Sequence, residues 1–431
     1  MSARIVVLGA GGLIGQALAT DLQVRGFAVR AVGRRFTAAQ VSALSDPVIA
    51  AAPALDDAAL ALLLADADVV VNCLGVLQGT DSDAVHHAFV ARLARLCAAQ
   101  TKLLVHLSVP GDAVDDHTAF SLTKREGERA MATSGAAHVI LRPGFVVGTT
   151  AYGGSAMIRA LAALPLRLPP RERNAPFAAT AMADIDETVA RVVARWRAGA
   201  RDWHATWDVM EDAPGTVGDI VERFRAHVGG PAPLLIAPVF LLAPGTWAGD
   251  AVALLGWRPP LRSTAIAEMR RGVRGDPKPW MAATSIVPLS AREAIARTPA
   301  TVQERWFARL YLLKGLALAV LVVFWCLSGA IALSFGFVAA RATLIAHGFS
   351  FALAHAVTIV SSCIDIFVGL LIAFRRTSRI GLVTGIAVSL GYMIGAAIIT
   401  PDLWVEPLGA LVKTGPAIVL MLVCLAIWED R

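Results

Sequence analysis

Three evenly spaced glycines near the start of the chain could bind the phosphates of a dinucleotide. They follow an apolar run, residues 4–8, and precede a stretch with helical periodicity, residues 16–22. Such a turn lets the backbone approach a pyrophosphate, while the first N–H groups of the helix point at the anion. The residues expected at the phosphates are Gly9, Gly12, Leu13, Ile14 and Gly15. A glycine-rich turn that only connects a strand to a helix is the alternative.

Two arginines, Arg34 and Arg35, follow the second expected strand, residues 26–33. In NAD-selective sites this strand usually ends in an acidic residue that binds the ribose 2′-hydroxyl, whereas a guanidinium suits a 2′-phosphate. The sequence therefore favours NADP(H) over NAD(H). A solvated basic loop is the alternative interpretation.

The elements that would position these groups alternate between strands and helices. A helix with an acidic start is expected over residues 56–64, a buried strand over 67–75, a long helix over 82–100 and a strand over 103–108. This alternation predicts a doubly wound parallel sheet with its ligand at the carboxyl ends of the strands. Leu74 and Gly75, at the end of one strand, are expected beside the nicotinamide half of the cofactor.

The composition indicates a membrane protein with more than one domain. The chain has 431 residues, 56% of them hydrophobic, and a mean hydropathy of +0.62 that reflects apolar segments near the C-terminus. The net charge of +6 comes without a basic block or stacking aromatics, so nucleic acid is not an expected partner. The five cysteines lack metal-ligand spacing, so no metal is expected, and the first strand starts too early for a signal peptide.

Four apolar segments are each long enough to cross a bilayer. They cover about 310–333, 349–374, 380–399 and 408–428. The basic residues near them are Arg305, Arg309, Lys314, Arg375, Arg376 and Arg379. The loop between the third and fourth segments holds Asp402 and Glu406 but no basic residue. The positive-inside rule then predicts a multi-pass protein of a bacterial inner membrane with both termini in the cytoplasm.

Three ionisable residues fall inside the apolar segments: His355, Asp365 and Lys413. Such groups are costly in a bilayer and usually mark a pathway or a buried pair. They would form a polar cluster if the second and fourth segments touched. A quinone or proton site is one interpretation; a structural pair of Asp365 with Lys413, or Lys413 reaching the surface, is the other.

The order and spacing of several motifs over residues 3–230 resemble the atypical short-chain dehydrogenase/reductase superfamily. The nearest branch contains the NADPH-binding accessory subunit of respiratory complex I. The motifs are the glycine turn, Asn72-Cys73-Leu74-Gly75, Val105-His106-Leu107-Ser108, Lys124 and Leu141-Arg142-Pro143-Gly144. The resemblance implies a Rossmann-type sheet with a small substrate lobe, and it adds Pro143 to the cofactor site.

In that superfamily a serine, a tyrosine and a lysine four residues later cooperate in catalysis. Ser108 and Lys124 match, but Phe120 occupies the tyrosine position. A phenyl ring carries no proton, and losing an acid–base group typically costs about 10²- to 10⁴-fold in rate. In one interpretation Ser108, Thr118, His117 or a water supplies the proton, or hydride passes to an acceptor that needs no protein acid. In the other, NADPH is bound without turnover.

The rest of the soluble part is less informative. Asp184 resembles the aspartate that begins a helix of the substrate lobe, and an N-cap is its simplest role. A strand over 207–210 and a helix over 216–227 complete the lobe. Residues 231–305, rich in proline and tryptophan, are expected to form a linker or membrane-proximal region that either enters the bilayer interface or is buried in the soluble domain.

The C-terminal part, about residues 306–428, resembles the DoxX-like four-helix membrane domain. The matching residues are Asp365-Ile366-Phe367-Val368-Gly369, the run from Pro401 to Gly409, and Lys413. Relatives in that heterogeneous family have been linked to quinone-dependent redox chemistry. The resemblance therefore implies an all-α transmembrane bundle and a quinone as one candidate ligand.

Together these observations predict an NAD(P)-binding domain over 1–230, a linker over 231–305 and a transmembrane domain over 306–431. The favoured function is a membrane-anchored NADP(H)-binding oxidoreductase acting on a quinone or another lipid-soluble compound. The alternative is a non-catalytic NADPH-binding sensor or an assembly protein of the membrane. The expected partners are the lipid bilayer, a lipophilic small molecule, and either a second copy or another membrane protein.

Overall fold

The computed structural model describes residues 3–77, 81–201, 203–405, 409 and 411–428. The chain divides into two compact units. The first comprises Met1–Trp247 and Pro260–Ala308, and the second comprises Ala248–Pro259 and Arg309–Arg431. Residues 260–305, which the sequence placed in a linker, thus cluster with residues 1–247.

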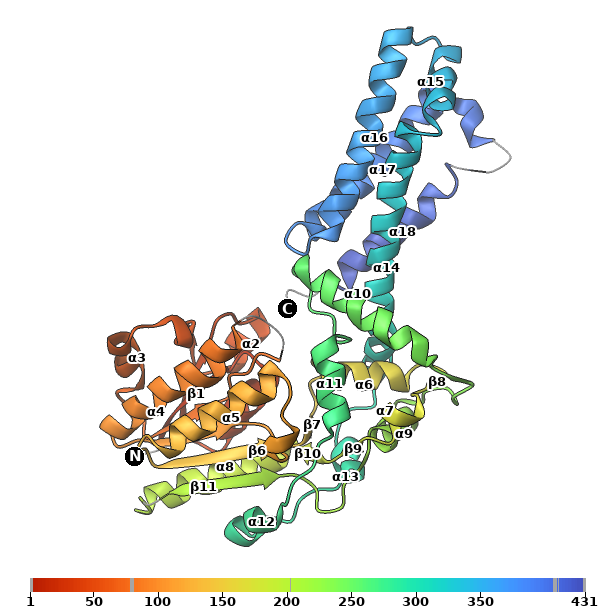
Figure 1. The fold of residues 1–431 in the computed structure, drawn as a ribbon. Helices are drawn as coiled ribbons and strands as arrows, with labels where there is room; N and C mark the ends of the chain where they lie inside the picture. Colours follow the sequence, from red (N-terminus) through yellow and green to blue (C-terminus); the bar gives the residue numbers. More distant parts are fainter. Residues whose placement is uncertain (1–2, 78–80, 202, 406–408, 410, 429–431) are drawn as a thin grey trace. The chain divides into compact units, whose positions relative to one another are not determined.

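The first unit is built on a seven-stranded parallel sheet with the order β11-β6-β5-β4-β1-β2-β3 (Figure 1). Its strands are β1 (Arg4–Leu8), β2 (Ala28–Gly33), β3 (Asp46–Ile49), β4 (Val69–Asn72), β5 (Leu103–Leu107), β6 (His138–Pro143) and β11 (His204–Val209). The chain order reverses at β1, so the crevice for a ligand lies where β1 and β4 end. The predicted doubly wound fold is confirmed.

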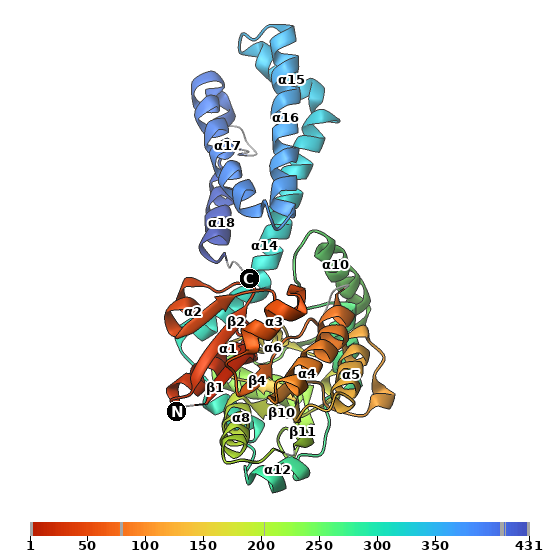
Figure 2. The ribbon, with the colours of Figure 1, turned by 90° about the vertical axis from the view of Figure 1, so that its left-hand side faces the viewer.

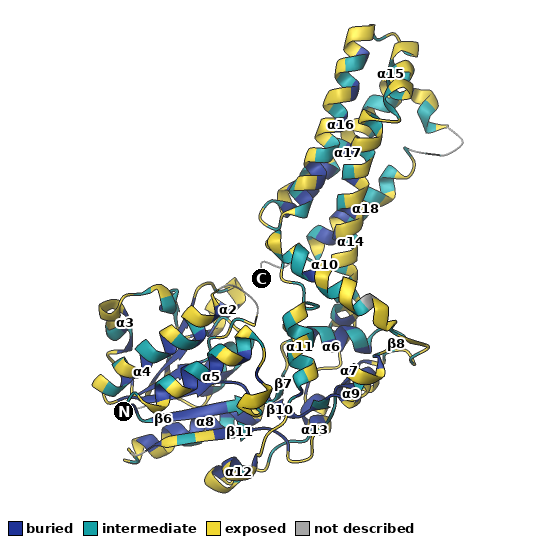
Figure 3. Cartoon of the chain, in the orientation of Figure 1, coloured by how far each residue is buried: buried dark blue, intermediate teal, exposed yellow. Residues whose placement is uncertain are grey.

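Helices cover both faces of this sheet and bury two apolar layers. The helices α1 (Leu13–Val24) and α8 (Met182–Arg197) pack on one face; α3 (Asp57–Leu64), α4 (Phe89–Ala99) and α5 (Ala119–Ala132) pack on the other. The same layers can be followed in Figure 2, and the buried strands between them are dark blue in Figure 3. The strands β4 and β5 are buried along their whole length because both faces are covered.

A small lobe packs beside the sheet around a third apolar cluster. It contains α6 (Gly154–Ala162), α7 (Pro170–Arg173), α9 (Val217–Val228) and the strand pair β7 (Phe145–Val147) and β10 (Ala179–Ala181). Three later helices complete the unit: α11 (Ser263–Arg271), α12 (Lys278–Thr284) and α13 (Ala291–Ala296). Trp280 of α12 is fully buried, and its Nε1 donates a hydrogen bond to Thr188 Oγ1 at 2.9 Å.

Two buried carboxylates hold the start of α13 against the lobe. Glu211 accepts hydrogen bonds from the N–H groups of Ala179 and Ala291 at 2.8 and 2.7 Å. Asp184 accepts one from the N–H of Leu289 at 3.0 Å. The expectation that Asp184 caps α8 is therefore wrong: it lies inside the first turn, which begins after Ala181, and its carboxylate is used by a distant segment instead.

The second unit is helical. Its helices are α14 (Val302–Leu333), α15 (Phe337–Ala346), α16 (Phe351–Ala373), α17 (Ser378–Ile399) and α18 (Thr414–Ala426). Among the described residues, α14, α16 and α17 are long and apolar enough to cross a membrane. The helices α14 and α16 approach closely because Gly369 has no side chain; a Cβ there would lie 2.5 Å from Cys326 Sγ.

The fourth predicted span differs from the expectation. The helix α18 has 13 residues, about 20 Å at 1.5 Å per residue, which is less than the ~30 Å hydrocarbon core. Pro416 lies in its first turn, where a residue without an N–H is tolerated. Residues 406–408, part of the resemblance to the DoxX-like family, lie outside the described residues.

Candidate functional site

The glycine turn connects β1 to α1 and is held by main-chain hydrogen bonds. The N–H groups of Gly9 and Ala10 donate to the Val32 carbonyl at 2.9 and 3.0 Å, and the N–H of Gly12 donates to the Gly9 carbonyl at 2.9 Å. Gly9 has a φ of 82°, which disfavours a side chain. A Cβ on Gly15 would lie 2.4 Å from the Gly9 oxygen, so the turn and the helix can pack this closely only with glycine there.

The start of α1 fits an anionic group. Gly12 is the N-cap and offers no side chain to the first N–H groups of the helix, and the first turn holds no acidic residue. The N–H groups of Leu13, Ile14 and Gly15 have no partner within the helix, because the first turn of any helix lacks preceding carbonyls. Together with the helix dipole, they make the predicted turn suitable for a pyrophosphate.

The two arginines after β2 lie next to this turn. A Cβ on Gly11 would be 2.8 Å from the Arg35 carbonyl oxygen, so the backbone after β2 touches the glycine turn directly. Arg34 and Arg35 are both exposed, and neither guanidinium forms an ion pair with a residue in the described part of the chain. Arg30, inside β2, is instead paired with Asp46 at 2.8 Å. Two guanidiniums with no ion-pair partner among the described residues thus follow the backbone that touches the glycine turn.

Lys124 reaches the carboxyl ends of two central strands. Its Nζ donates hydrogen bonds to the carbonyl oxygens of Leu74 and Leu107 at 3.0 and 2.8 Å. The side chain is only 4% exposed, and this burial lowers the pKa of Lys124 to about 8 despite an opposing effect of Cys73. An ammonium group has three N–H donors, so one remains for a ligand beside Gly75.

Phe120, in the first turn of α5, packs against His86 with ring centroids 5.4 Å apart in an edge-on contact. His86 Nε2 accepts a hydrogen bond from the Val76 N–H at 2.9 Å, so Nδ1 carries the proton and faces Thr123 Oγ1 at 3.0 Å. Burial lowers the pKa of His86 to about 3, with Lys124 adding to the effect. The imidazole is neutral, and the tyrosine position offers neither an acid nor a base.

Sequence reasoning missed His86. It lies in the helix predicted over 82–100, which begins with a π-helical turn, η2 (Ala84–Ala88), before α4. The pair His86-His87 in an otherwise apolar stretch was the available signal. Its ring joins the segment after β4 to α5, so it holds the backbone around Leu74 and Gly75 in place.

The other matching residues lie at the same edge of the sheet. Ser108 follows β5 and is 8% exposed; its Oγ is close to Glu128 but forms no hydrogen bond of standard geometry with a described residue. Pro143 is buried at the end of β6. Thr118 is the N-cap of α5 and its Oγ1 donates to Glu268 Oε1, whereas His117 is exposed. Of the two hydroxyl groups among the candidate proton donors, that of Ser108 therefore forms fewer hydrogen bonds with described residues than that of Thr118.

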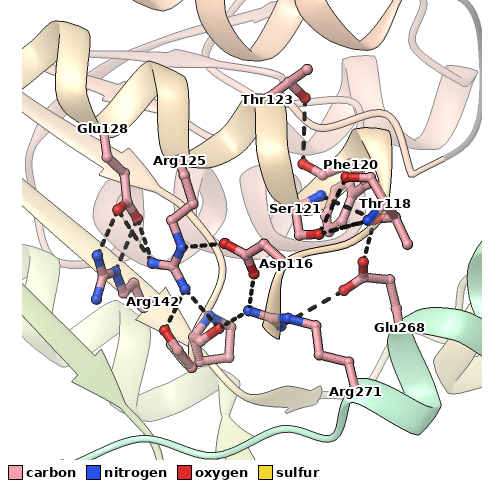
Figure 4. Close-up of polar contacts among 12 residues, drawn as sticks. Asp116, Thr118, Phe120, Ser121, Thr123, Arg125, Glu128, Arg142, Glu268 and Arg271 are labelled. Atoms are coloured by element: carbon pink, nitrogen blue, oxygen red, sulfur yellow. Dashed lines mark hydrogen bonds and ion pairs between the residues drawn. The ribbon is translucent and has the colours of Figure 1, made fainter. Parts of the chain in front are cut away.

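A buried network of charges surrounds the start of α5 (Figure 4). Arg125 Nε lies 2.9 Å from Asp116 Oδ2, and Arg125 Nη1 lies 3.2 Å from Glu128 Oε2. Arg142 Nη2 lies 2.6 Å from the same Glu128 oxygen. Burial alone would raise the pKa of Glu128, but Arg142 and Arg125 hold that pKa below its usual range.

The helix α11 joins this network, which the sequence did not indicate. Arg271 lies 2.5 Å from Asp116, and the neighbouring Arg270 lies 2.5 Å from the buried Glu172 of α7. A pocket of about 330 Å³ lies beside these contacts, between α11 and the segment before α5. It is lined by Asp115, His117, Thr118, Ala267, Glu268, Arg270 and Arg271.

In the second unit, the three predicted polar residues have separate surroundings. Asp365 accepts a hydrogen bond from the Tyr392 hydroxyl at 2.9 Å. His355 lies edge-on to Phe337 and ten residues before Asp365 on α16, about 15 Å away at 1.5 Å per residue. Lys413 is the N-cap residue of α18. Within the described residues no hydrogen bond or ion pair joins these three. Tyr392, the hydroxyl in the third apolar segment, was not singled out from the sequence.

Comparisons with known proteins agree with this architecture. A family model described as NAD(P)H-binding matches residues 9–163, and one described as a DoxX-like family matches residues 322–422. A dTDP-4-dehydrorhamnose reductase from Mycolicibacterium smegmatis is 29% identical over 167 residues. That alignment covers 34% of this chain and 46% of the reductase, so the chain spans less than half the length of this curated relative.

Solved structures resemble the fold at low sequence identity. The Bordetella bronchiseptica enzyme WbmH in complex with NAD⁺ is 14% identical with a TM-score of 0.51, covering 72% of this chain and 99% of that one. TunA, an NAD-dependent NDP-hexosamine 5,6-dehydratase involved in tunicamycin biosynthesis, gives the same identity, TM-score and coverage. The Helicobacter pylori ADP-L-glycero-D-manno-heptose-6-epimerase is 13% identical with a TM-score of 0.50, covering 68% and 94%.

At this identity the structures support the fold alone, whereas the two family models identify the parts of the chain. The predicted resemblances are confirmed at that level. The chain therefore joins an NAD(P)H-binding domain, built on a Rossmann-like parallel sheet, to a C-terminal DoxX-like domain whose apolar helices fit a membrane.

Proposed function

We propose that the protein is a membrane-bound, NADP(H)-dependent oxidoreductase that reduces a lipid-soluble acceptor, with a quinone as the simplest candidate. One observation carries this proposal: Lys124 retains its buried place at the ends of β4 and β5, while the tyrosine position holds Phe120. The groups that hold a dinucleotide are therefore kept, and the usual proton donor is replaced.

Different residues of the first unit would bind different parts of the cofactor. The N–H groups of Leu13, Ile14 and Gly15 would bind the pyrophosphate, and Arg34 with Arg35 would bind the 2′-phosphate that distinguishes NADP(H). The remaining donor of Lys124 would bind a hydroxyl of the nicotinamide ribose. Leu74, Gly75 and Pro143 would line the nicotinamide, which supplies a hydride when bound.

The missing tyrosine limits which acceptors are suitable. A quinone takes up the hydride and then a proton from water, giving a hydroquinone, so the protein need not supply an acid in the transition state. Ser108 would donate a hydrogen bond to the acceptor oxygen, on which negative charge develops. A ketone, by contrast, would form an unprotonated alkoxide at a site without a strong acid.

The membrane half supports the lipid-phase assignment. Joining a cofactor domain to membrane-spanning helices raises the effective concentration of a lipid-soluble acceptor near the site. The basic residues in the N-terminal part of α14 and after α16 favour an inner-membrane protein with both termini in the cytoplasm, where NADPH is available. We assign residues 1–230 to cofactor binding and 306–431 to the membrane; of the intervening residues 231–305, those from Pro260 onward cluster with the first unit.

The test is NADPH oxidation by the purified full-length protein in lipid nanodiscs, with a short-chain quinone as acceptor. We expect turnover that depends on quinone, exceeds that with NADH, and falls at least tenfold in Ser108→Ala without loss of NADPH binding. Binding of NADPH with no oxidation above the protein-free rate would rule out the enzyme.

A second candidate is a non-catalytic NADPH-binding sensor or assembly protein. The contact of Phe120 with a neutral His86 favours it, because this part of the site is packed and holds no titrating group at neutral pH. Phe120→Tyr, assayed with aldehydes and nucleotide sugars, separates the two candidates. Activity that appears only in this variant would indicate a site whose chemistry has been lost.

A further inference from the structure

One segment of the chain exposes large apolar side chains at close intervals. It comprises β13 (Leu235–Ile236), η4 (Val239–Leu241) and α10 (Leu242–Leu254). Together with the preceding Leu234, seven of its side chains are 58–87% exposed: Leu234, Leu235, Ile236, Val239, Phe240, Trp247 and Leu254. Exposed positions along α10 are yellow in Figure 3. Soluble surfaces rarely carry so many large apolar groups in one contiguous stretch, so this segment is expected to be covered.

The composition of α10 is unusual for a helix in contact with water. Its sequence, LAPGTWAGDAVAL, contains a single charged residue, Asp250, and has no polar face. A helix that is apolar all round is normally buried in a protein core or in lipid. Because Trp247 and Leu254 are 75% and 87% exposed, the rest of the described chain does not bury this one.

The contacts of the residues that follow α10 indicate what covers this helix. The boundary between the two units falls within α10, after Trp247, so Ala248–Pro259 belongs to the membrane unit. The Leu255 carbonyl accepts a hydrogen bond from the Arg375 N–H at 3.1 Å, and Trp257 Nε1 donates to the Ala373 carbonyl at 2.7 Å. Ala373 ends α16, so these bonds fix the chain at the end of a membrane-spanning helix.

Aromatic and basic residues gather at this level, as is typical of a bilayer interface. The Trp257 ring lies edge-on to Trp428 with centroids 5.8 Å apart, and Lys314 Nζ lies 5.7 Å from the centroid of the same Trp428 ring. Arg376 follows in the loop after α16, and Arg379 lies in the first turn of α17. The exposed apolar segment therefore leads directly into a cluster of tryptophan and basic residues at the end of α16.

We propose that residues 234–254 lie in the interface of the lipid bilayer, forming a membrane contact separate from the spanning helices. The helix α10 has 13 residues, about 20 Å, and is too short to cross the ~30 Å hydrocarbon core, so it lies along the membrane surface. Its apolar side chains enter the boundary between headgroups and acyl chains. This inference does not depend on catalysis.

The test places a fluorescent coumarin amino acid at Trp247, or separately at Phe240, in the full-length protein in nanodiscs. The matched control is position Val24, which is 81% exposed at the end of α1. Spin-labelled lipids should quench the probe at 247 and at 240 at least threefold more than at 24, and aqueous iodide should show the reverse order. Unchanged NADPH binding would show that each labelled protein is folded.

Two results would overturn the proposal. Iodide quenching at 247 and 240 equal to that at 24, without quenching by lipid, would mean that the segment faces water. Protection from both quenchers would mean that a protein surface, such as a second copy of the chain, covers it instead. Using two labelled positions guards against a local disturbance at either one.

Discussion

Adding a single methyl group at Gly15 should weaken binding of the cofactor while the domain still folds. A Cβ there would lie 2.4 Å from the Gly9 oxygen and 2.8 Å from the Gly9 carbonyl carbon, both of them backbone atoms that cannot rotate away. Cβ contacts below 3.0 Å are essentially never seen, so Gly15→Ala must move the turn and α1 apart by at least about 0.6 Å.

This displacement would move the N–H groups that are proposed to bind the pyrophosphate. A hydrogen bond to a charged group contributes about 1.5–3 kcal/mol, and each 1.4 kcal/mol is a tenfold change in affinity. Losing one such bond should weaken NADPH binding roughly 10- to 150-fold. The measurement is a titration of the full-length protein in nanodiscs, followed by NADPH fluorescence, together with a thermal unfolding curve.

Two other glycines provide a graded control. A Cβ on Gly12, in the same turn, would lie 3.3 Å from the Gly9 oxygen, and one on Gly154 of α6 would meet nothing within 4 Å. Gly12→Ala should therefore weaken binding less than Gly15→Ala, and Gly154→Ala should leave it unchanged. NADPH affinity within twofold of wild type in Gly15→Ala, or a larger loss in Gly12→Ala, would refute the reasoning.

Three further changes test other parts of the unit. Glutamate at both Arg34 and Arg35 should weaken NADPH binding at least tenfold and leave NADH binding within twofold; equal losses for both nucleotides would argue against a 2′-phosphate site. Asp116→Ala removes the carboxylate shared by the buried Arg125 and Arg271 guanidiniums, which keep only Glu128 and Glu268 as ion-pair partners among the described residues, and should lower the free energy of unfolding by up to about 3–5 kcal/mol, whereas the exposed Asp115 serves as the control in denaturant titrations. The pKa of Glu128 is lowered in the fold, so its stabilising contribution is complete above its unfolded pKa of about 4.3 and is lost as pH falls through the lower folded value. The stability difference between wild type and Glu128→Gln should therefore shrink on acidification, and a constant difference would contradict this assignment.

Local patterns were sufficient to predict the sheet and the cofactor turn. The strands β1, β4 and β5 are short apolar runs bounded by glycine or polar residues, and such runs must be buried on both faces. The same reasoning located Gly9, Gly15 and Lys124, because a glycine turn and a lysine at strand ends depend on residues close in sequence or on a known spacing.

Contacts between distant residues could not be predicted in this way. Asp116 and Arg271 are charged residues like many others, and only folding brings α11 beside the segment before α5. The role of His86 could not be predicted, because a histidine in a predicted helix does not reveal which residues its imidazole will contact. Tyr392 similarly gave no indication that it would donate to Asp365 on another helix.

The adjacent arginines of α11 also determine how the first unit can move. Arg270 is paired with Glu172 in the lobe, and Arg271 is paired with Asp116 beside the sheet, so consecutive residues fasten one helix to both halves of the unit. Any hinge opening of the lobe away from the sheet must therefore break at least one of these two ion pairs. One helix thus restrains the lobe and the sheet together through two consecutive arginines.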